Sequence, residues 1–326
     1  MGIDLELISQ VGAYSFKNEH ELLKSIKELS HLFNHSRDKL ADYLDDEKLC
    51  SAYLYFYFMT YLPKFQKCIE LLGPNFRTQI QGSALIDIGA GPGTLFHSQN
   101  WPGFSLYAVE NSKVMIDIGK KLAHITSLNI QWNKQVQEEK RCLFFTHSLN
   151  EMGEKEAFEY MEAYSPQNVV LIEPGTKESF HKILGFRKQI LERGYNVQYP
   201  CPSNDVCPMQ GQDDWCHQII QVRQLPEIER LCQKLQMDRR NQPAVLHWYS
   251  REKKQIQYAL ITRVFAETKF SFEWQVCCEN KLQKVQLMKK ELDKKQQKLI
   301  KSWQAGQQIQ FEVLKHMQGF LRITLI

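Results

Sequence analysis

One short segment constrains the fold of this chain more than any other. It is the apolar run ALIDIGAG at residues 84–91, which ends in glycines and continues as Pro92-Gly93-Thr94. Such a run is typical of a buried parallel strand that enters a tight turn. Glycine there lets the backbone turn sharply and approach a ligand closely. The segment therefore predicts a parallel α/β sheet with a ligand site beside this strand.

The rest of the chain supports that prediction by its alternation of apolar runs and helical patterns, which is typical of a doubly wound α/β sheet. Upstream, two helical patterns precede the sheet, and Pro63 is expected to kink or break the second. We therefore expect a helical region over 1–80, an α/β domain over 81–199 and a cysteine-rich, basic third region over 200–326. The expected strands are 84–91, 104–110, 141–150 and 168–175, and the expected helices are 18–45, 47–72, 113–125, one from about 154, and 177–194.

The glycine loop distinguishes between two cofactor classes. A dinucleotide fingerprint would need glycine at position 94, which is Thr94, and Pro92 removes a backbone N–H that a pyrophosphate would use. An acidic residue is expected about 20 residues after the loop, where it holds ribose hydroxyls. Glu110 ends the next strand, 21 residues after Gly89.

The pattern G-x-G-x-G, formed by Gly89, Gly91 and Gly93 after Asp87, resembles the first motif of class I S-adenosylmethionine-dependent methyltransferases. The resemblance implies a Rossmann-like sheet, glycines beneath the methionine part of the cofactor, and Glu110 on its ribose. The alternative is a fold that keeps the glycine turn and binds no cofactor.

Catalytic residues are not identified by the sequence. Methyl transfer depends mostly on proximity and orientation. Asn150 and Glu151 follow the strand at 141–150, and either could face the cofactor, so Asn150 is a candidate cofactor-binding residue. Glu173 ends the next strand and either lines the site or belongs to a turn. The Pro-Pro-aromatic platform of many base-amino methyltransferases is absent after Asn150.

Nine cysteines are many for a chain whose start, MGIDLELISQ, has no apolar run of a signal peptide. No segment is apolar for long enough to cross a bilayer. We therefore expect a soluble, cytoplasmic protein with no membrane partner, in which disulfides are rare and grouped cysteines are metal ligands or reactive thiols. The isolated Cys50, Cys68, Cys142 and Cys232 are expected to pack in the core.

Three cysteines, Cys201, Cys207 and Cys216, lie in a Pro- and Asp-rich segment with the spacing C-x5-C-x8-C. That segment has little apolar surface with which to fold itself, so a metal could organise it. A tetrahedral zinc or a four-iron cluster needs a fourth ligand. His217 and the Cys277-Cys278 pair are the candidates, and unrelated cysteines in a loop are the alternative.

Together these motifs resemble the ribosomal small-subunit methyltransferase-like family of the Rsm twenty-two type, found in bacteria and in mitochondrial ribosome assembly. The most specific part is YPCPSNDVCPMQGQDDWCH at 199–217, and DIGAGPGT, SLNEMGEKE, IEPGTKESFHKILGFRKQIL and VCCENKLQKV also fit. The resemblance implies an iron–sulfur (4Fe-4S) cluster held by Cys201, Cys207, Cys216 and Cys277, with Cys278 as the rival for the last position. Zinc is the alternative metal.

The resemblance also implies the small ribosomal subunit and its RNA as partners. A net charge of +4 says little by itself, but residues 281–301 carry eight Lys against Glu291 and Asp293. This segment, and residues 223–254 with Trp248 and Tyr249, are candidate RNA contacts, with a solvated helix face as the alternative for the lysines.

Three functions remain open from the sequence. The first is an RNA methyltransferase, the second a non-catalytic iron–sulfur assembly factor, and the third a small-molecule methyltransferase with structural zinc. In each case we expect a monomer.

Overall fold

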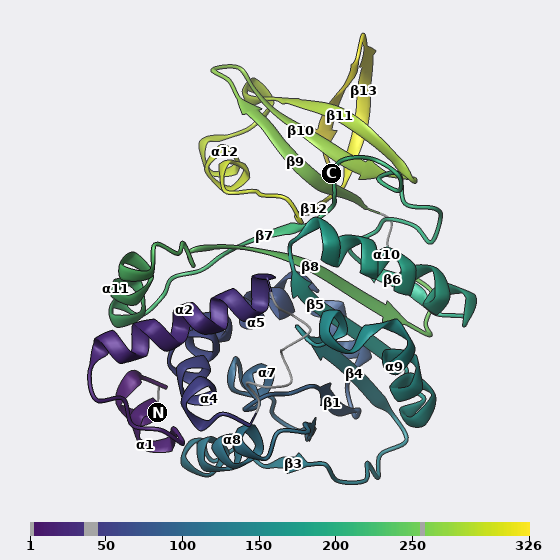
Figure 1. Cartoon of the computed structure of the whole chain (residues 1–326). Coiled ribbons are helices and arrows are strands. Elements are labelled where there is room, and N and C mark those ends of the chain that lie inside the picture. The colour runs from purple at the N-terminus through teal and green to yellow at the C-terminus, as the bar shows by residue number, and fades with distance from the viewer. Residues whose placement is uncertain (1–2, 36–44, 255–257) are drawn as a thin grey trace. The chain divides into compact units, whose positions relative to one another are not determined.

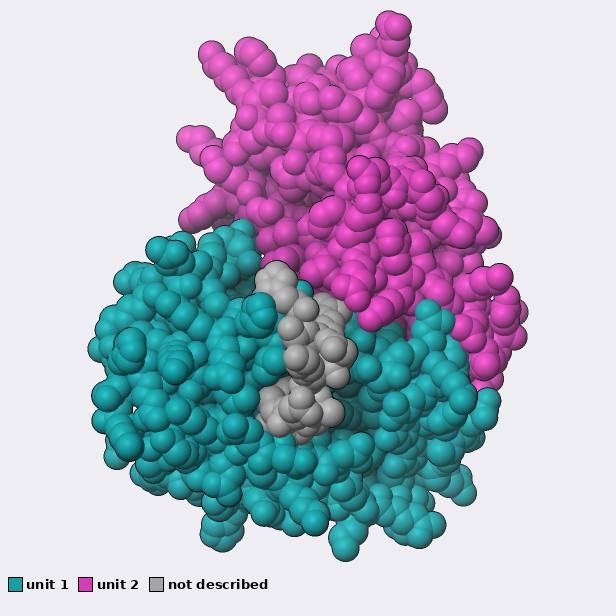
Figure 2. Space-filling model, viewed as in Figure 1, with its two compact units in different colours: residues 1–166, 220–242 teal, residues 167–219, 243–326 magenta. Residues whose placement is uncertain are grey.

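The computed structural model describes residues 3–35, 45–254 and 258–326 (Figure 1). The chain forms two compact units, shown in separate colours in Figure 2. The first unit comprises Met1–Pro166 and Ile220–Gln242, and the second comprises Gln167–Ile219 and Pro243–Ile326. The three-part division at residues 80 and 199 stays a prediction about domain organisation.

The first unit contains the strand that the glycine motif predicted, and this strand, β1 (Ala84–Ile88), is completely buried. It pairs in parallel with both β2 (Ser105–Val109) and β4 (Arg141–Thr146), and β2 pairs in parallel with β3 (Ile130–Trp132). The strand order is therefore β3-β2-β1-β4. The α/β fold class is confirmed, and only the three-residue β3 was not predicted.

The helices of the first unit agree with the periodicity except near Pro63. The helix containing Pro63 continues through it, and the irregularity lies upstream, where Leu54–Phe58 form a π-helix. A single π-helical turn accommodates an extra residue within an α-helix, and such turns are frequent at functional sites. Of the kink or break expected at Pro63, the break is therefore wrong. The helical elements are α1 (Leu5–Val11), α2 (Glu19–His35), α4 (Glu47–Tyr53), η2 (Leu54–Phe58), α5 (Met59–Leu71), α6 (Pro74–Gln79), α7 (Thr94–His97), α8 (Lys113–Thr126), α9 (Leu149–Tyr164) and α11 (Pro226–Leu235).

One apolar cluster joins the N-terminal helices to α8 and α11. Its fully buried members include Ile26, Phe56 and Leu122. α11 belongs to this unit because Ile228 and Leu231 on its apolar face enter the same cluster. The part of the expected 18–45 helix beyond residue 35 lies outside the described residues.

The second unit begins with β5 (Asn168–Pro174), α10 (Lys177–Glu192) and β6 (Asn196–Tyr199), of which β5 and α10 were predicted. A later strand, β8 (Asn241–Ser250), pairs antiparallel with both β5 and β6 and gives the order β5-β8-β6. β7 (Gln218–Gln221) pairs with β8. The sheet is therefore mixed, because a strand remote in sequence enters it in the opposite direction.

A separate six-stranded sheet occupies the end of the chain, with the order β12-β9-β10-β11-β14-β13. One of its faces packs against an apolar cluster. The cluster includes Trp274 and Val285 from the sheet and Ile300 from the short helix α12. The elements are β9 (Ala259–Glu267), β10 (Ser271–Cys278), β11 (Lys281–Met288), η3 (Lys289–Glu291), α12 (Lys294–Lys301), β12 (Gln308–Ile309), β13 (Phe311–Met317) and β14 (Phe320–Leu325). Among the helices of the described ranges, none combines the length and the apolar character that crossing a membrane requires.

Candidate functional site

The first candidate site lies in the first unit, at the carboxyl edge of its parallel strands. The glycine loop follows β1, Glu110 follows β2, and Ser148 and Asn150 follow β4. The strand order reverses between β1 and β4, since β2 lies on one side of β1 and β4 on the other. In open α/β sheets, ligands bind outside the carboxyl ends of the strands at such a switch point.

The three loop glycines have positive φ angles of 69°, 54° and 82° at Gly89, Gly91 and Gly93, which L side chains rarely adopt. Gly89 is also required by close packing, because a Cβ there would lie 2.7 Å from the Cβ of Ser148. Gly91 differs, since a Cβ there would meet no atom within 4 Å in the described structure. The space over Gly91 is therefore free for a ligand.

Glu110 holds the loop in shape. Its carboxylate accepts hydrogen bonds from the backbone N–H of Gly91 (2.8 Å), Asn111 (2.9 Å) and Ser112 (2.9 Å). Asn133, which the sequence did not single out, exchanges two bonds with the Glu110 backbone at 3.0 and 2.7 Å. The acidic residue expected to bind ribose thus also fixes the backbone of Gly91.

Two buried polar atoms beside the loop lack a partner in the described part of the chain. Asp87 is fully buried, and its Oδ1 accepts from the Thr146 hydroxyl at 2.9 Å, whereas Oδ2 accepts nothing. The Ser148 hydroxyl is likewise without a partner. Burial raises the pKa of Asp87 well above its usual range. Unpaired buried polar groups are rare in proteins, so their presence beside this loop fits a bound polar ligand.

Asn150 lies in the first turn of α9, two residues after Ser148, and Gly153 (φ 83°) interrupts that helix before the Glu154 start that was predicted. His147, at the end of β4, has its Nε2 2.9 Å from Nζ of Lys64, a lysine that is 3% exposed. Burial and then the Lys64 charge lower the pKa of His147 well below its usual range, so its ring is neutral. Glu173 is fully buried on β5 of the second unit.

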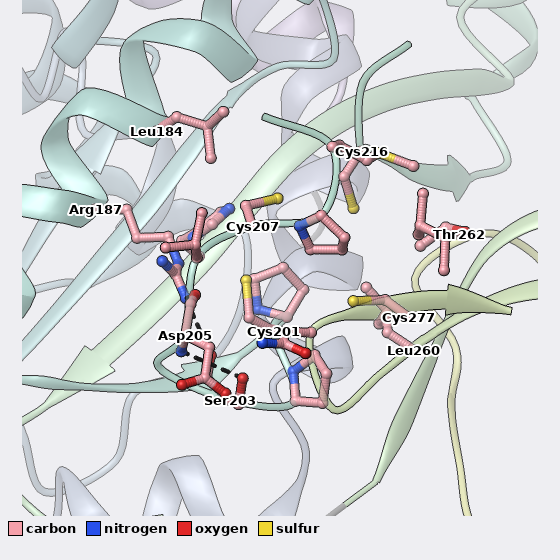
Figure 3. A pocket seen from close by; sticks show the side chains of 18 residues that line it. Leu184, Arg187, Cys201, Ser203, Asp205, Cys207, Cys216, Leu260, Thr262 and Cys277 are labelled. Carbon is pink, nitrogen blue, oxygen red and sulfur yellow. Dashed lines mark hydrogen bonds between the residues drawn. The ribbon is translucent and has the colours of Figure 1, made fainter. Parts of the chain in front are cut away.

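The second candidate site lies entirely in the second unit. Cys201, Cys207, Cys216 and Cys277 line one pocket, and Figure 3 shows their sulfur atoms turned toward a common centre. The first three come from the segment between β6 and β7, and Cys277 comes from β10 of the second sheet. We refer to these four residues as the cysteine pocket. Cys201 and Cys277, which are 76 positions apart in the sequence, thus line the same pocket.

The fold separates Cys277 from its two rivals. Neighbouring residues of a strand point to opposite faces, so Cys277 faces the pocket while Cys278 packs against the apolar cluster of the second sheet. The ring of His217 instead packs against Trp215, and its Nδ1 lies 3.3 Å from the Trp215 carbonyl oxygen. His217 is not among the described residues that line the pocket.

The four thiols of the cysteine pocket influence one another electrostatically. Burial, followed by the three other sulfurs of the pocket, raises the pKa of the Cys216 thiol well above its usual range. Burial also raises the pKa of Cys277 to about 12, and Cys201 and Cys207 add to the effect. Within the described ranges, no three His, Cys, Asp or Glu side chains are grouped closely enough to hold one metal ion.

The remaining cysteines, Cys50, Cys68, Cys142 and Cys232, are buried, as expected. Trp248 and Tyr249 are also buried, at 3% and 0% exposure, because both lie on β8 between its two partner strands. Their proposed role as RNA contacts is therefore wrong. The lysine-rich segment forms β11, η3 and α12 rather than one helix, and most of its lysines are exposed.

Comparison with known proteins supports a family assignment. A family model described as "Mitochondrial small ribosomal subunit Rsm22" matches residues 70–307. This range contains the glycine loop, Glu110 and all four residues of the cysteine pocket. No curated protein matches the chain at a significant level.

Solved structures give weaker likenesses, and the ones described here are methyltransferases. Magnesium protoporphyrin IX methyltransferase from Synechocystis is 12% identical, with 70% of this chain and 97% of that one covered and a TM-score of 0.37. A proposed RNA methyltransferase from Pyrococcus horikoshii is 14% identical (56% and 83% covered, TM-score 0.34). The methyltransferase domain of a bacterial Hen1 is also 14% identical (57% and 98% covered, TM-score 0.35). These scores are too low to carry an argument. The strand order of the chain itself describes an α/β, class I methyltransferase-like fold with mixed sheets.

Proposed function

The chain belongs to the Rsm22 family of mitochondrial small ribosomal subunit proteins, and we propose that it is an S-adenosylmethionine-binding, methyltransferase-like protein that acts on small-subunit ribosomal RNA. The observation that carries the proposal is the glycine loop at the strand switch point, where no atom of the described residues lies within 4 Å of a Cβ built on Gly91. Because the family is described as mitochondrial, the cytoplasmic location expected from the sequence stays a prediction. The monomeric state also stays a prediction.

Each residue of the proposed cofactor site has a definable role. When bound, S-adenosylmethionine supplies an activated methyl group. Gly89, Gly91 and Gly93 let the backbone approach the cofactor, and Glu110 fixes the Gly91 backbone while its carboxylate remains at the ribose position. Asp87 and Asn150 are the polar side chains we propose beside it. No side chain is assigned as the catalytic base, because transfer to an RNA nitrogen or oxygen depends first on orientation.

Calorimetry with purified full-length protein tests this proposal directly. We expect saturable binding of S-adenosylmethionine, and of the demethylated product, with one site per chain. Mapping methylated nucleotides in small-subunit RNA, with and without the protein, then tests transfer. The absence of heat with either ligand would refute cofactor binding.

We also propose that the cysteine pocket holds a 4Fe-4S cluster. The donor set fits, because four thiols from two separate parts of the second unit face one centre. A single zinc ion needs all its sulfurs about 2.3 Å from one point, whereas a four-iron cube holds each cysteine at a different corner. When bound, such a cluster would cross-link the β6–β7 segment to β10. Zinc is the alternative, and iron, sulfide and zinc analysis after anaerobic purification decides between them.

The pocket also favours a second function, that of a non-catalytic iron–sulfur assembly factor. The cysteine pocket lies wholly in the second unit, whereas the proposed cofactor residues lie in the first. A cluster in the cysteine pocket could therefore have a structural role even if the protein transfers no methyl group. Cofactor binding and RNA crosslinking without any methylated nucleotide would favour this function. A small-molecule methyltransferase with zinc is favoured instead by one zinc per chain and no RNA crosslink.

The proposed RNA contact surface lies on η3 and α12. Lys290, Lys294, Lys295 and Lys298 are exposed, and no ion pair is found for them within the residues described. Phe270, at 65% exposure, lies beside Lys289, the first residue of η3, because its carbonyl accepts from the Lys289 N–H at 2.8 Å. Lysines that meet phosphates, with an exposed ring for base stacking, are typical of surfaces that bind single-stranded nucleic acid.

Replacing Lys294, Lys295 and Lys298 together with glutamine is expected to weaken RNA binding and flatten its salt dependence. The logarithmic slope should fall by ~0.7 for each phosphate of single-stranded RNA that a lysine no longer neutralises. Fluorescence anisotropy with small-subunit RNA fragments at several salt concentrations measures both. The matched control replaces the exposed Lys120, Lys121 and Lys155 of the first unit. Equal affinity and slope in the two variants would contradict the assignment.

A further inference from the structure

A buried arginine lies against the cysteine pocket. Arg187 belongs to α10, lines the pocket and is 5% exposed. A buried guanidinium costs free energy unless its charge and donors are satisfied. Among the described residues that line this pocket, the basic ones are Arg187 and His247, and burial lowers the pKa of His247 to about 3. A second cation, Lys254, lies next to the lining and donates to the Cys201 carbonyl oxygen at 2.6 Å. The charge of Arg187 therefore needs an explanation from its surroundings.

Part of the explanation is the loop between Cys201 and Cys207. Arg187 Nη2 donates to the carbonyl oxygens of Ser203 (3.0 Å) and Asp205 (2.7 Å), as the dashed lines in Figure 3 show. Ser203 and Asp205 both lie between the two cysteines, so these two bonds from one nitrogen fix the backbone that presents their sulfurs. Arginine suits this task because its planar guanidinium holds further N–H donors in fixed directions.

These two bonds leave donor capacity unused. The Nε–H of Arg187 is buried and has no acceptor in the described part of the chain. The guanidinium is not isolated from the sulfurs, since its side chain also hydrogen-bonds to Cys201 and lies close enough to Cys201 and Cys207 for their charges to interact. Four thiolates outweigh the positive charge of an iron–sulfur core, so the bound group is an anion whose sulfur atoms accept hydrogen bonds.

From these contacts we propose that Arg187 is a positioning residue for the cluster, which clamps the Cys201–Cys207 loop and supplies positive charge and an N–H donor to the sulfur atoms. This inference rests on the proposed 4Fe-4S assignment. Hydrogen bonds and net charge around a cluster set its reduction potential. A cation stabilises the reduced cluster more than the oxidised one, because reduction adds negative charge.

Two substitutions separate the clamp from the charge. Arg187→Lys keeps the positive charge and loses the planar guanidinium that bonds the Ser203 and Asp205 carbonyls and Cys201 together. The cluster should then form but be lost several-fold faster to a chelator. Arg187→Met removes the charge too, so the potential should also shift to more negative values. Lys188→Met, at the exposed neighbouring position on α10, is the matched control and should behave as the wild type.

The test uses full-length protein purified anaerobically, with iron and sulfide per chain, visible absorbance, spectroelectrochemical titration and circular dichroism. Should Arg187→Met not fold, the chelator rate of Arg187→Lys still tests the clamp. Unchanged iron content, loss rate and potential in both variants would overturn the inference while leaving the cluster intact. A wild-type protein without iron and sulfide would instead refute the cluster itself and with it this role.

Discussion

Cys277→Ser is expected to remove most of the iron bound per chain, whereas Cys278→Ser is expected to leave it near the wild-type value. The physical reason is the alternation of side chains along β10, which turns Cys277 into the cysteine pocket and Cys278 onto the apolar cluster of the second sheet. A hydroxyl is a poor ligand for iron where a thiolate is removed, so three remaining thiolates should not retain an intact 4Fe-4S cluster.

The two variants are matched in chemistry and differ in sequence by one position. Cys278→Ser buries a hydroxyl beside apolar side chains and should cost about 1 kcal/mol in the free energy of unfolding. Iron, sulfide and zinc contents, with the visible spectrum, are measured on anaerobically purified protein alongside chemical denaturation. The reverse result, with iron lost only from the Cys278 variant, would show that the register of β10 is different. If both variants kept the wild-type iron content, Cys277 would not be a ligand.

The two candidate sites differ in how far the sequence could predict them. The strand and glycine turn of the candidate cofactor site could be predicted because their determinants are local. A buried strand, a glycine turn and an acidic residue 21 positions after Gly89 follow one another along the chain. Parallel pairing of β1 with β2 then places Gly89 beside the end of β2, where the Gly89 N–H donates to the Val109 carbonyl at 2.9 Å.

The fourth cysteine could not be identified from residue patterns, because its position depends on contacts between distant segments. Which of two adjacent strand residues faces inward is decided by the packing of the whole sheet, and β10 also carries irregular register against β9. For the same reason β8 was not predicted, since its pairing with β5 joins residues 70 to 82 positions apart. Trp248 and Tyr249 on this strand are buried. Arg187 gives no signal in the sequence, since a charged residue on an amphipathic helix usually faces solvent.

Glu110 illustrates a role that spacing alone did not predict. Three backbone N–H groups converge on its carboxylate, which is 7% exposed. The bond from the Gly91 N–H helps to hold Gly91 at its positive φ. The residue therefore prepares the loop before any ligand arrives, and a cofactor contact would be added to this structural role.

Gly91→Ala is expected to lower the affinity for S-adenosylmethionine at least about tenfold, or ~1.4 kcal/mol, with little effect on the fold. The new methyl group meets no protein atom within 4 Å among the described residues, so it projects into the space that we assign to the cofactor. Adopting φ 54° with a side chain costs roughly 1–2 kcal/mol. Calorimetry measures the affinity, and chemical denaturation measures the stability.

Gly103→Ala supplies the control that separates the two effects. Gly103 also has a positive φ, of 78°, and a Cβ there also meets nothing within 4 Å, but it lies in the turn before β2 rather than in the glycine loop. Both variants should therefore lose similar stability, while only Gly91→Ala loses affinity. Gly91→Asp should lose more, because it adds a negative charge near the Glu110 carboxylate. If Gly91→Ala and Gly103→Ala bind S-adenosylmethionine as the wild type does, the cofactor does not pass over Gly91, and the observation on which the proposed function rests is lost.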